Sequence, residues 1–392
     1  MPETVDVVEL LKRLVACPSV SPAEGVACEP PFGERRLVEM LAALCGEWGA
    51  HVEIQDVAPG RANLVARFDG ADASRSIAFE AHADTVRVDD MTIPPFEPAV
   101  RDGKVYGRGA CDTKGSMAAM LVAIKRTLDE RGKPPITTYF VSTCDEELGG
   151  KGAQHLARKI AKVGFAPDAC VIGEPTMLDV VHANRGVLRW VVTTKGQAGH
   201  ATSSGAANAI YHMRRVLACI EGPIAARLVE DPHPVLGPRS INVGTIRGGT
   251  QVNTVPSSCA IEVDRRTLPG EERDTITSDF RAALEELKAE CPALDVHVRE
   301  SQWYPALDEP LDSPLVRAAV AACERVLGQA RTRGVPWTTN AGFLREAGVP
   351  CVVMGPGTTE QAHTVDEYLE LEQLARAVDV YGAVLRAYSG GE

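Results

Sequence analysis

The 392-residue sequence lacks the features that mark membrane-spanning, exported and nucleic-acid-binding proteins. No segment offers about 18 consecutive uncharged apolar residues, and the opening MPETVDVVELLKRLVA has no basic region followed by an uninterrupted apolar stretch. Basic residues number 41 against 53 acidic ones, and the formal charge of -12 disfavours polyanions. We therefore expect a cytoplasmic protein with no nucleic-acid or membrane partner.

Paired cysteines and a serine-hydrolase elbow are also missing. The 11 cysteines are an odd number without a CxxC pair, which favours free thiols over a disulfide framework. Cys111 and Cys144 lie inside motifs discussed below, but no cysteine-protease signature surrounds them, so we expect buried packing residues. There is no GxSxG motif and no internal repeat. The length of the chain favours two domains, and its ordinary globular composition predicts that the chain folds throughout.

Helical and strand patterns alternate along both ends of the chain and predict an α/β fold. The expected helices lie near residues 5–15, 34–48, 116–128, 154–160, 314–327 and 371–388. The expected strands lie near residues 51–57, 62–68, 76–84, 136–143, 168–173 and 349–355. Strands separated by helices favour a largely parallel or mixed sheet covered on both faces.

The pattern changes near Gly186. A strand-like stretch is followed by a helix, two more strands and a charged helix, which we interpret as a β-α-β-β-α-β order with one sheet and two helices on one face. The expected elements lie near residues 186–199, 207–220, 240–246, 258–264 and 272–290. We predict a discontinuous catalytic domain of residues 1–185 and 302–392, interrupted by an inserted α+β domain of residues 186–301.

Polar residues with ligand chemistry follow the predicted strands. In AHADTV, the period of two places His82 and Asp84 on one side, where one could bind a metal and the other orient it. A hydrogen-bonded histidine at a strand end is the alternative. In GRGACDTKG, Asp112 stands among glycines before a helix, as a ligand or as a helix cap. A dinucleotide fingerprint fails because Asp112 occupies the third glycine position.

Further carboxylates follow the later strands. CDEELGG carries three in a row, either as a hydrated turn or as a site at the carboxyl end of a strand, where α/β sheets bind ligands. Adjacent side chains diverge, which suits Glu147 as a metal ligand and Glu146 as a base for the reacting water. Glu174 in VIGEPT and His363 in GPGTTEQAHTVDEY complete the set. Mixed nitrogen and oxygen ligands without thiolates favour zinc, cobalt or manganese in a hydrolytic site.

Six motifs in order resemble the metallopeptidase family that includes acetylornithine deacetylase, succinyl-diaminopimelate desuccinylase, aminoacylase-1 and a carboxypeptidase. They are AHADTV, GRGACDTKG, CDEELGG, VIGEPT, GHAT…NAI and GPGTTEQAH, and they span nearly the whole chain. The resemblance implies two zinc ions per chain, with Co²⁺ or Mn²⁺ as alternatives. It implies that His82 and Glu174 hold one ion, that Glu147 and His363 hold the other, and that Asp112 bridges them.

The resemblance also implies catalytic and quaternary roles. Asp84 would stand behind His82, and Glu146 would be the general acid and base. The inserted domain would serve as a lid and as the interface of a homodimer. His200, in GQAGHATSS, would reach the partner subunit's active site to help hold the oxyanion, although an exposed loop histidine is the alternative.

Substrate recognition is implied less directly. Asn253 and Arg266 match lid positions similar to substrate-carboxylate binders, and Arg265 beside them is expected to face outward. Asn340 departs from the family, which often has an acidic residue there, so its contacts are an open question. The CDEELGG and GPGTTEQAHTVDEY segments resemble most the acetylornithine deacetylase branch of the family, which implies N-acetylornithine as substrate.

Several functional alternatives stay open. They are succinyl-diaminopimelate desuccinylase, an N-acyl amino acid hydrolase or dipeptidase, and a catalytically silent dimeric binding protein. The intact ligand set and Glu146 favour an enzyme, a metal-dependent hydrolase of linear amides.

Overall fold

This computed structural model describes residues 5–23, 25–160, 166–202 and 207–390. The chain divides into two compact units. The first unit comprises Met1–Ala183, Asp308–Gly334 and Asn340–Glu392, and the inserted unit comprises Asn184–Leu307 and Val335–Thr339. Among the described residues, no helix combines the length and the apolar character needed to cross a bilayer.

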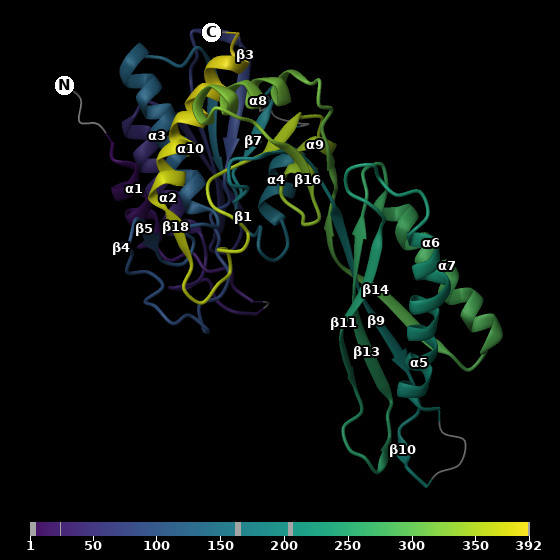
Figure 1. Ribbon diagram of the computed structural model, residues 1–392. Coiled ribbons are helices and arrows are strands. Elements are labelled where there is room, and N and C mark those ends of the chain that lie inside the picture. Colours follow the sequence, from purple (N-terminus) through teal and green to yellow (C-terminus); the bar gives the residue numbers. More distant parts are fainter. Residues whose placement is uncertain (1–4, 24, 161–165, 203–206, 391–392) are drawn as a thin grey trace. The chain divides into compact units, whose positions relative to one another are not determined.

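A nine-stranded mixed sheet forms the centre of the first unit (Figure 1). Its strands are β1 (His51–Ala58), β2 (Arg61–Phe68), β6 (Ile136–Ser142), β3 (Asp72–Glu80), β7 (Cys170–Ile172), β17 (Cys351–Val353), β8 (Val180–Asn184) and β15 (Leu307–Asp308) in spatial order, with β16 (Thr332–Val335) paired to β8. The four neighbours β6, β3, β7 and β17 run parallel. Strands β1, β2 and β8 pair antiparallel. The predicted mixed sheet is confirmed.

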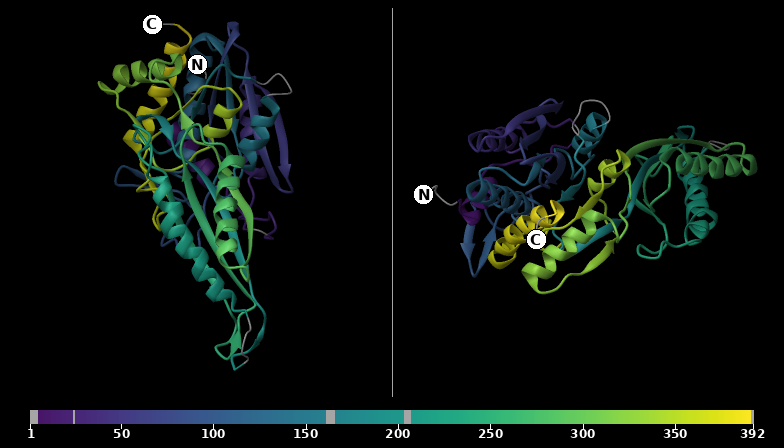
Figure 2. Two further views of the ribbon diagram at one scale, coloured as in Figure 1. Left: turned by 90° about the vertical axis from the view of Figure 1, so that its right-hand side faces the viewer. Right: turned by 90° about the horizontal axis from the view of Figure 1, so that it is seen from above.

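Helices cover both faces of this sheet (Figures 1 and 2). One face carries α1 (Val7–Val15), α2 (Arg35–Glu47), α3 (Lys114–Arg131), α8 (Pro314–Leu327) and α10 (Leu371–Tyr388), whose apolar side chains share one core. The other face carries α4 (Lys151–Ile160) and α9 (Ala341–Glu346). A small sheet of β4 (Ala99–Arg101), β5 (Lys104–Tyr106) and β18 (Tyr368–Glu370) lies at the start of α10, which follows β18 directly, and was absent from the sequence prediction.

The inserted unit is an antiparallel sheet with helices on one face (Figure 1). Its main elements are β9 (Gly186–Lys195), α5 (Ala209–Cys219), η1 (Ile220–Ile224), α6 (Ala225–Leu228), β11 (Ser240–Gly248), β13 (Ser258–Thr267), α7 (Arg273–Glu290) and β14 (Asp295–Tyr304). The strands lie in the order β11-β13-β9-β14, as in the predicted β-α-β-β-α-β arrangement. Between sheet and helices, the rings of Trp190 and Phe280 stack with centroids 4.4 Å apart. A short pair, β10 (Gly199–His200) and β12 (Thr254–Val255), accompanies the sheet.

The expectation that Arg265 faces outward is wrong. Alternation along β13 places Ile261, Val263 and Arg265 on the face that the helices cover, and Arg265 is 7% exposed. Its guanidinium group donates to Glu271, with Nη2 2.7 Å from Oε1. The buried charge is therefore paired, which is the condition under which burial of an arginine is tolerated.

Candidate metal centre

The predicted ligands gather at one edge of the large sheet. Parallel strands end at the same edge, and the crevice beyond their carboxyl ends is where α/β sheets bind ligands. His82 follows β3, Glu147 follows β6, Glu174 follows β7 and His363 lies on the segment after β17, while Asp112 lies in the loop before α3. The parallel order of these strands is why residues far apart in sequence meet.

Two candidate metal groups share one carboxylate. In the first, which we call the His82 group, His82 Nε2 lies 2.9 Å from Asp112 Oδ1 and 3.9 Å from Glu174 Oε1. In the second, the His363 group, His363 Nε2 lies 3.2 Å from Asp112 Oδ2 and 3.1 Å from Glu147 Oε1. Within each group the possible ligand atoms lie within 4.8 Å of one another. The two oxygens of Asp112 thus face two different imidazoles, so one carboxylate could bridge two ions.

The electrostatics of the site fit divalent cations. Burial raises the pKa of Glu147 to about 7, and the nearby charge of Asp112 adds to the shift. Burial, again followed by the charge of Asp112, raises the pKa of Glu174 well above its usual value. Carboxylates crowded in a low-dielectric site resist ionisation until cations offset their repulsion. Two imidazoles and three carboxylates without a thiolate suit zinc, cobalt or manganese, and the donor set does not choose among them.

The pKa values of the two imidazoles are also raised, because both rings face carboxylates. Hydrogen bonds to Asp112 and Glu147 raise the pKa of His363 to about 11. Burial lowers the pKa of His82, but the hydrogen bond to Asp112 and the charge of Glu174 outweigh it, and the net pKa lies well above its usual value. Without a metal, both imidazoles therefore hold protons that a binding ion would displace.

Asp84 positions both the histidine and the acidic turn. Its backbone oxygen lies 3.0 Å from His82 Nδ1, which leaves Nε2 facing the carboxylates. Its carboxylate, 3.7 Å from that ring, accepts the backbone N–H groups of Glu146 at 2.9 Å and Glu147 at 3.0 Å. One residue thus fixes the orientation of a candidate ligand and the turn that carries another ligand and the candidate base.

Glu367 supports the Asp112 loop, and sequence reasoning missed it. This buried carboxylate accepts the backbone N–H groups of Gly109 at 3.0 Å, Cys111 at 2.9 Å and Asp112 at 3.0 Å. It also accepts from Arg108 Nη1 at 2.8 Å. The VDEYLE stretch reads as the polar start of a helix, and no local pattern distinguishes Glu367 from its exposed neighbours.

Arg61 pairs with the acidic turn that carries Glu146 and Glu147, and sequence reasoning missed it as well. It is buried, donates to Ser21 Oγ at 2.8 Å and to both oxygens of Glu34, and pairs with Asp145. Its Nη2 lies 3.9 Å from Asp84 Oδ2. A buried arginine with several carboxylate partners holds them in a fixed geometry. A lone arginine beside a strand gives no sequence signal of this role.

Asn340, the departure from the family pattern, lies behind β3. It is buried, and its Nδ2 donates to Glu80 Oε1 at 3.2 Å and to Thr143 Oγ1 at 3.0 Å. Glu80 precedes His82 by two residues on the same chain segment. Asn340 therefore contacts a polar cluster beneath the histidine and belongs to neither candidate metal group.

The two cysteines inside the motifs are buried, as expected. Cys111 and Cys144 have no exposed surface. Burial raises the pKa of both thiols well above the usual value. Both are therefore protonated at neutral pH and unsuited to nucleophilic chemistry.

The remaining predicted site residues belong to the inserted unit. His200 is exposed in β10, and its Nδ1 lies 2.8 Å from Thr202 Oγ1. Asn253 is exposed, and its backbone oxygen accepts from Ala201 N at 3.0 Å. Arg266 donates through Nε to Asp264 Oδ1 at 2.8 Å. The GHAT…NAI motif runs through residues 203–206, which lie outside the described residues. The roles of these three side chains at the metal edge stay predictions.

The mixed sheet, the inserted α+β unit and the paired ligand groups define a metal-dependent hydrolase that acts on amides. The chain belongs to peptidase family M20/M25/M40, which matches residues 78–387. It is similar to the acetylornithine deacetylase of Vibrio parahaemolyticus, with 29% identity over 387 residues, 97% of this chain and 98% of that protein. The family expected from the motifs is thereby confirmed.

Solved structures share the fold. An M20 family metallo-carboxypeptidase from Sulfolobus solfataricus superposes with a TM-score of 0.82 at 16% identity, covering 98% of this chain and 99% of that one. A Bacillus subtilis protein described as a dinuclear metal binding peptidase from the M20 family has a TM-score of 0.68 at 19% identity, covering 97% and 96%. At these identities the likeness establishes the arrangement of the backbone, and the substrate has to be argued from the site and tested.

Proposed function

We propose that this protein is a two-zinc deacetylase that hydrolyses N-acetyl-L-ornithine to ornithine and acetate. The observation that carries the hydrolytic part is the position of Asp112 between two imidazoles, each with a further carboxylate. The similarity to acetylornithine deacetylase over nearly the whole length of both proteins supports the substrate.

The residues divide into two ligand sets in this proposal. His82 and Glu174 would hold one ion, Glu147 and His363 would hold the other, and Asp112 would contribute to both groups. When bound, two such ions polarise the amide carbonyl and lower the pKa of water. The distances from the two Asp112 oxygens to the two imidazoles support this division.

Glu146 is the general acid and base in this proposal. Its backbone N–H is held by Asp84, in the turn that also carries Glu147. Burial raises the pKa of Glu146 well above its usual value, although the charge of His82 opposes the shift. A carboxylate with a raised pKa can take the proton of the attacking water and deliver it to the nitrogen of the leaving amine.

The inserted unit supplies substrate contacts and the dimer interface in this proposal. Asn253 and Arg266 bind the substrate carboxylate, and the partner subunit's His200 helps to hold the oxyanion. Exposed apolar side chains of this unit support an interface, since Tyr211 is 67% exposed and Val252 is fully exposed. Sedimentation analysis of the full chain tests the dimer, and a monomer at micromolar concentration would contradict it.

A substrate panel tests the reaction. We expect metal-loaded protein to release ornithine from N-acetyl-L-ornithine with a higher kcat/KM than it shows for N-succinyl-diaminopimelate, N-acetylmethionine or a dipeptide. Hydrolysis of the succinylated compound without release of ornithine would overturn the substrate and keep the amide hydrolysis.

Glu146→Gln tests the base. We expect turnover to fall by about 10² to 10⁴-fold, the usual contribution of a general acid or base, while metal content stays at the wild-type level. Glu360→Gln, an exposed position three residues from His363, is the matched control. Normal turnover in Glu146→Gln with wild-type metal content would refute the assignment.

A further inference from the structure

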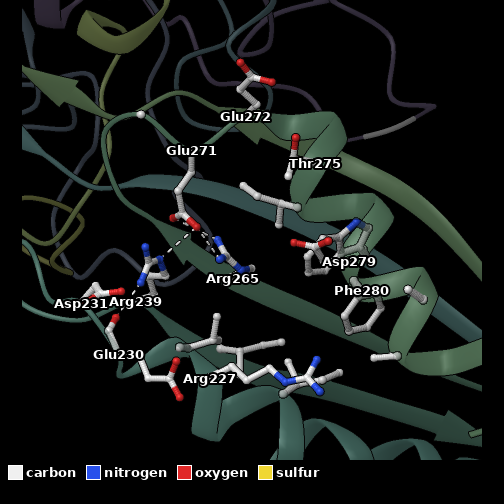
Figure 3. A pocket seen from close by; sticks show the side chains of 18 of the residues that line it. Arg227, Glu230, Asp231, Arg239, Arg265, Glu271, Glu272, Thr275, Asp279 and Phe280 are labelled. Carbon is white, nitrogen blue, oxygen red and sulfur yellow. Dashed lines mark hydrogen bonds and ion pairs between the residues drawn. The ribbon is translucent and has the colours of Figure 1, made fainter. Parts of the chain in front are cut away.

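A cavity of about 680 Å³ lies within the inserted unit, between its helices and its sheet (Figure 3). All of its lining residues belong to this unit, whereas the candidate metal groups belong entirely to the first unit. Its volume falls in the range of about 300 to 1,000 Å³ that is typical of small-molecule sites. Neither the proposed reaction nor the predicted site residues use it.

The floor of the cavity is apolar. It is formed by the stacked rings of Trp190 and Phe280 together with Ile241 from β11, Ile276 from α7 and Leu228 from α6. Trp190 has no exposed surface, and Phe280 and Ile276 are buried. These buried side chains belong to the packed core of the unit and hold the floor in a fixed shape, and the partly buried Ile241 offers apolar surface to the methylene groups of a ligand.

One wall carries a pair of guanidinium groups. Arg239 Nε and Arg265 Nη2 donate to Glu271 Oε1 at 3.0 and 2.7 Å, and Leu268 N donates to Glu271 Oε2 at 2.7 Å. Arg239 also donates through Nη1 to the backbone oxygen of Glu230 at 2.7 Å. Glu271 is thus occupied by protein donors. The two guanidinium groups share the Glu271 carboxylate, and Glu230 and Asp231 lie beside Arg239 (Figure 3), so this wall is held together by its own paired charges.

The rest of the lining is mostly acidic. Three arginines and six carboxylates line the cavity, so its formal charge is -3. In Figure 3 the Arg239–Glu271–Arg265 cluster lies on one side, and Asp279 and Phe280 project from α7 on the other. Within the described part of the chain, the side chains of Arg227 and Asp279 make no hydrogen bond or ion pair and are available to a ligand.

We propose that this cavity binds a small α-amino acid that carries a second cationic group on its side chain. The carboxylate of such a ligand meets the guanidinium of Arg227, the lining arginine whose side chain is not engaged by Glu271. Its two cationic groups meet Asp279 and the other carboxylates, and its methylene chain covers the partly buried side chains of Ile224 and Ile241. A ligand of net charge +1 that also carries one anionic group matches both the excess of acid in the lining and the guanidinium of Arg227.

Calorimetric titration of full-length, metal-loaded protein with L-lysine tests the proposal. We expect saturable binding by the wild type and its loss in Ala282→Trp. Ala282 is an exposed lining residue of α7, so a large side chain there fills the cavity from its solvent side without removing a buried contact. Norleucine lacks the terminal amine and cadaverine lacks the carboxylate, so each should bind about tenfold more weakly than lysine, the loss expected for one charged hydrogen bond.

Substitutions that remove one charged group of the cavity at a time test which residue binds each end of the ligand. We expect Asp279→Asn and Arg227→Gln each to weaken lysine binding by about ten- to a hundredfold, the range of a charged hydrogen bond. Asp274→Asn on the same helix and Arg214→Gln on α5 do not line the cavity and should bind lysine as the wild type does. The proposal fails if lysine does not bind saturably, if Ala282→Trp binds it unchanged, or if cadaverine binds as tightly as lysine.

Discussion

The two candidate metal groups share Asp112 but lie in different surroundings. In the His82 group, the side chains of His82 and Glu174 are 1% and 8% exposed, and both residues follow central strands of the sheet. In the His363 group, the side chain of His363 is 51% exposed and belongs to a loop residue with a φ of 59°. One imidazole is held by the sheet, and the other is held by a loop at the surface.

This difference has a consequence for metal retention. A ligand fixed by a packed core keeps its geometry when the ion leaves, whereas an exposed loop ligand can move and admit water. We therefore expect the His82 group to keep its ion longer than the His363 group during dialysis against a chelator. Four substitutions and one change of condition break or sharpen the comparison.

Asp112→Asn should have the largest effect because it weakens both groups at once. The amide keeps the size of the side chain but loses the charge that both imidazoles face. We expect metal content to fall toward zero and kcat/KM to fall by about 10³-fold or more, as expected when electrostatic stabilisation and metal are both lost. Elemental analysis of the purified protein measures the first effect. Retention of two ions would mean that Asp112 is not shared.

His363→Ala and His82→Ala should separate the groups. We expect His363→Ala to lose the ion of the His363 group and keep the other ion, because the His82 group retains His82, Asp112 and Glu174. His82→Ala should lose more metal and also stability, since it leaves a gap among buried carboxylates. Metal content and thermal denaturation of the two variants, measured side by side, check this order. Equal metal loss in both would contradict the comparison.

Glu367→Gln should have an intermediate effect that acts through Asp112. The amide no longer carries the charge that pairs with Arg108 and accepts three backbone N–H groups. Loss of such an outer contact typically lowers metal affinity by about 10- to 100-fold. Glu370→Gln, three residues along the same segment, is the control. Competition with a chromogenic chelator measures the metal affinity. An unchanged affinity would show that the Asp112 loop keeps its conformation without the Glu367 carboxylate.

The pH dependence of the metal-free protein should be the smallest effect. The folded pKa of Glu147, about 7, and that of His363, about 11, both lie above the usual values of 4.5 and 6.5. The folded state thus binds more protons than the unfolded one, and the free energy of unfolding falls as pH rises through these ranges. Melting temperatures at pH 6 and pH 9 should show this decline in chelator-treated wild type and less of it in His363→Ala. A melting temperature of chelator-treated wild type that rises from pH 6 to pH 9 would contradict this prediction.

The helices that the sequence predicted best are those with strong local signals. The bounds expected for α8 agree with the structure, where Ser313 accepts from Val316 N, Pro314 opens the helix and Gly328 ends it with a φ of 76°. Caps and proline act within one turn, so a single sequence carries them. The three-residue strands β4, β5 and β18 are too short to show a period and form only because partners meet.

The residues of the candidate site also differ in whether a local sequence signal predicts them. His82, Glu147 and Glu174 could be predicted because each follows an apolar strand, and the order of the motifs joined them. Glu367 and Arg61 could not be predicted, because their roles depend on contacts between distant segments. Glu367 accepts from a residue 255 positions earlier, and Arg61 pairs with one 84 positions later. Burial of a charge is a property of the folded chain and leaves no mark on neighbouring residues.

The contact between Glu367 and the Asp112 loop also determines the order in which the parts of the metal site can form during translation. When residues up to Glu174 have left the ribosome, His82, Asp112 and Glu174 are present, but neither the second imidazole nor the carboxylate that receives the Asp112 loop has been synthesised. The growing chain therefore carries only one of the two ligand groups from the synthesis of Glu174 until that of His363, a stretch of 189 of the 392 residues (363 − 174). Completion of the second group, and of the support for the shared ligand, waits for the segment around His363.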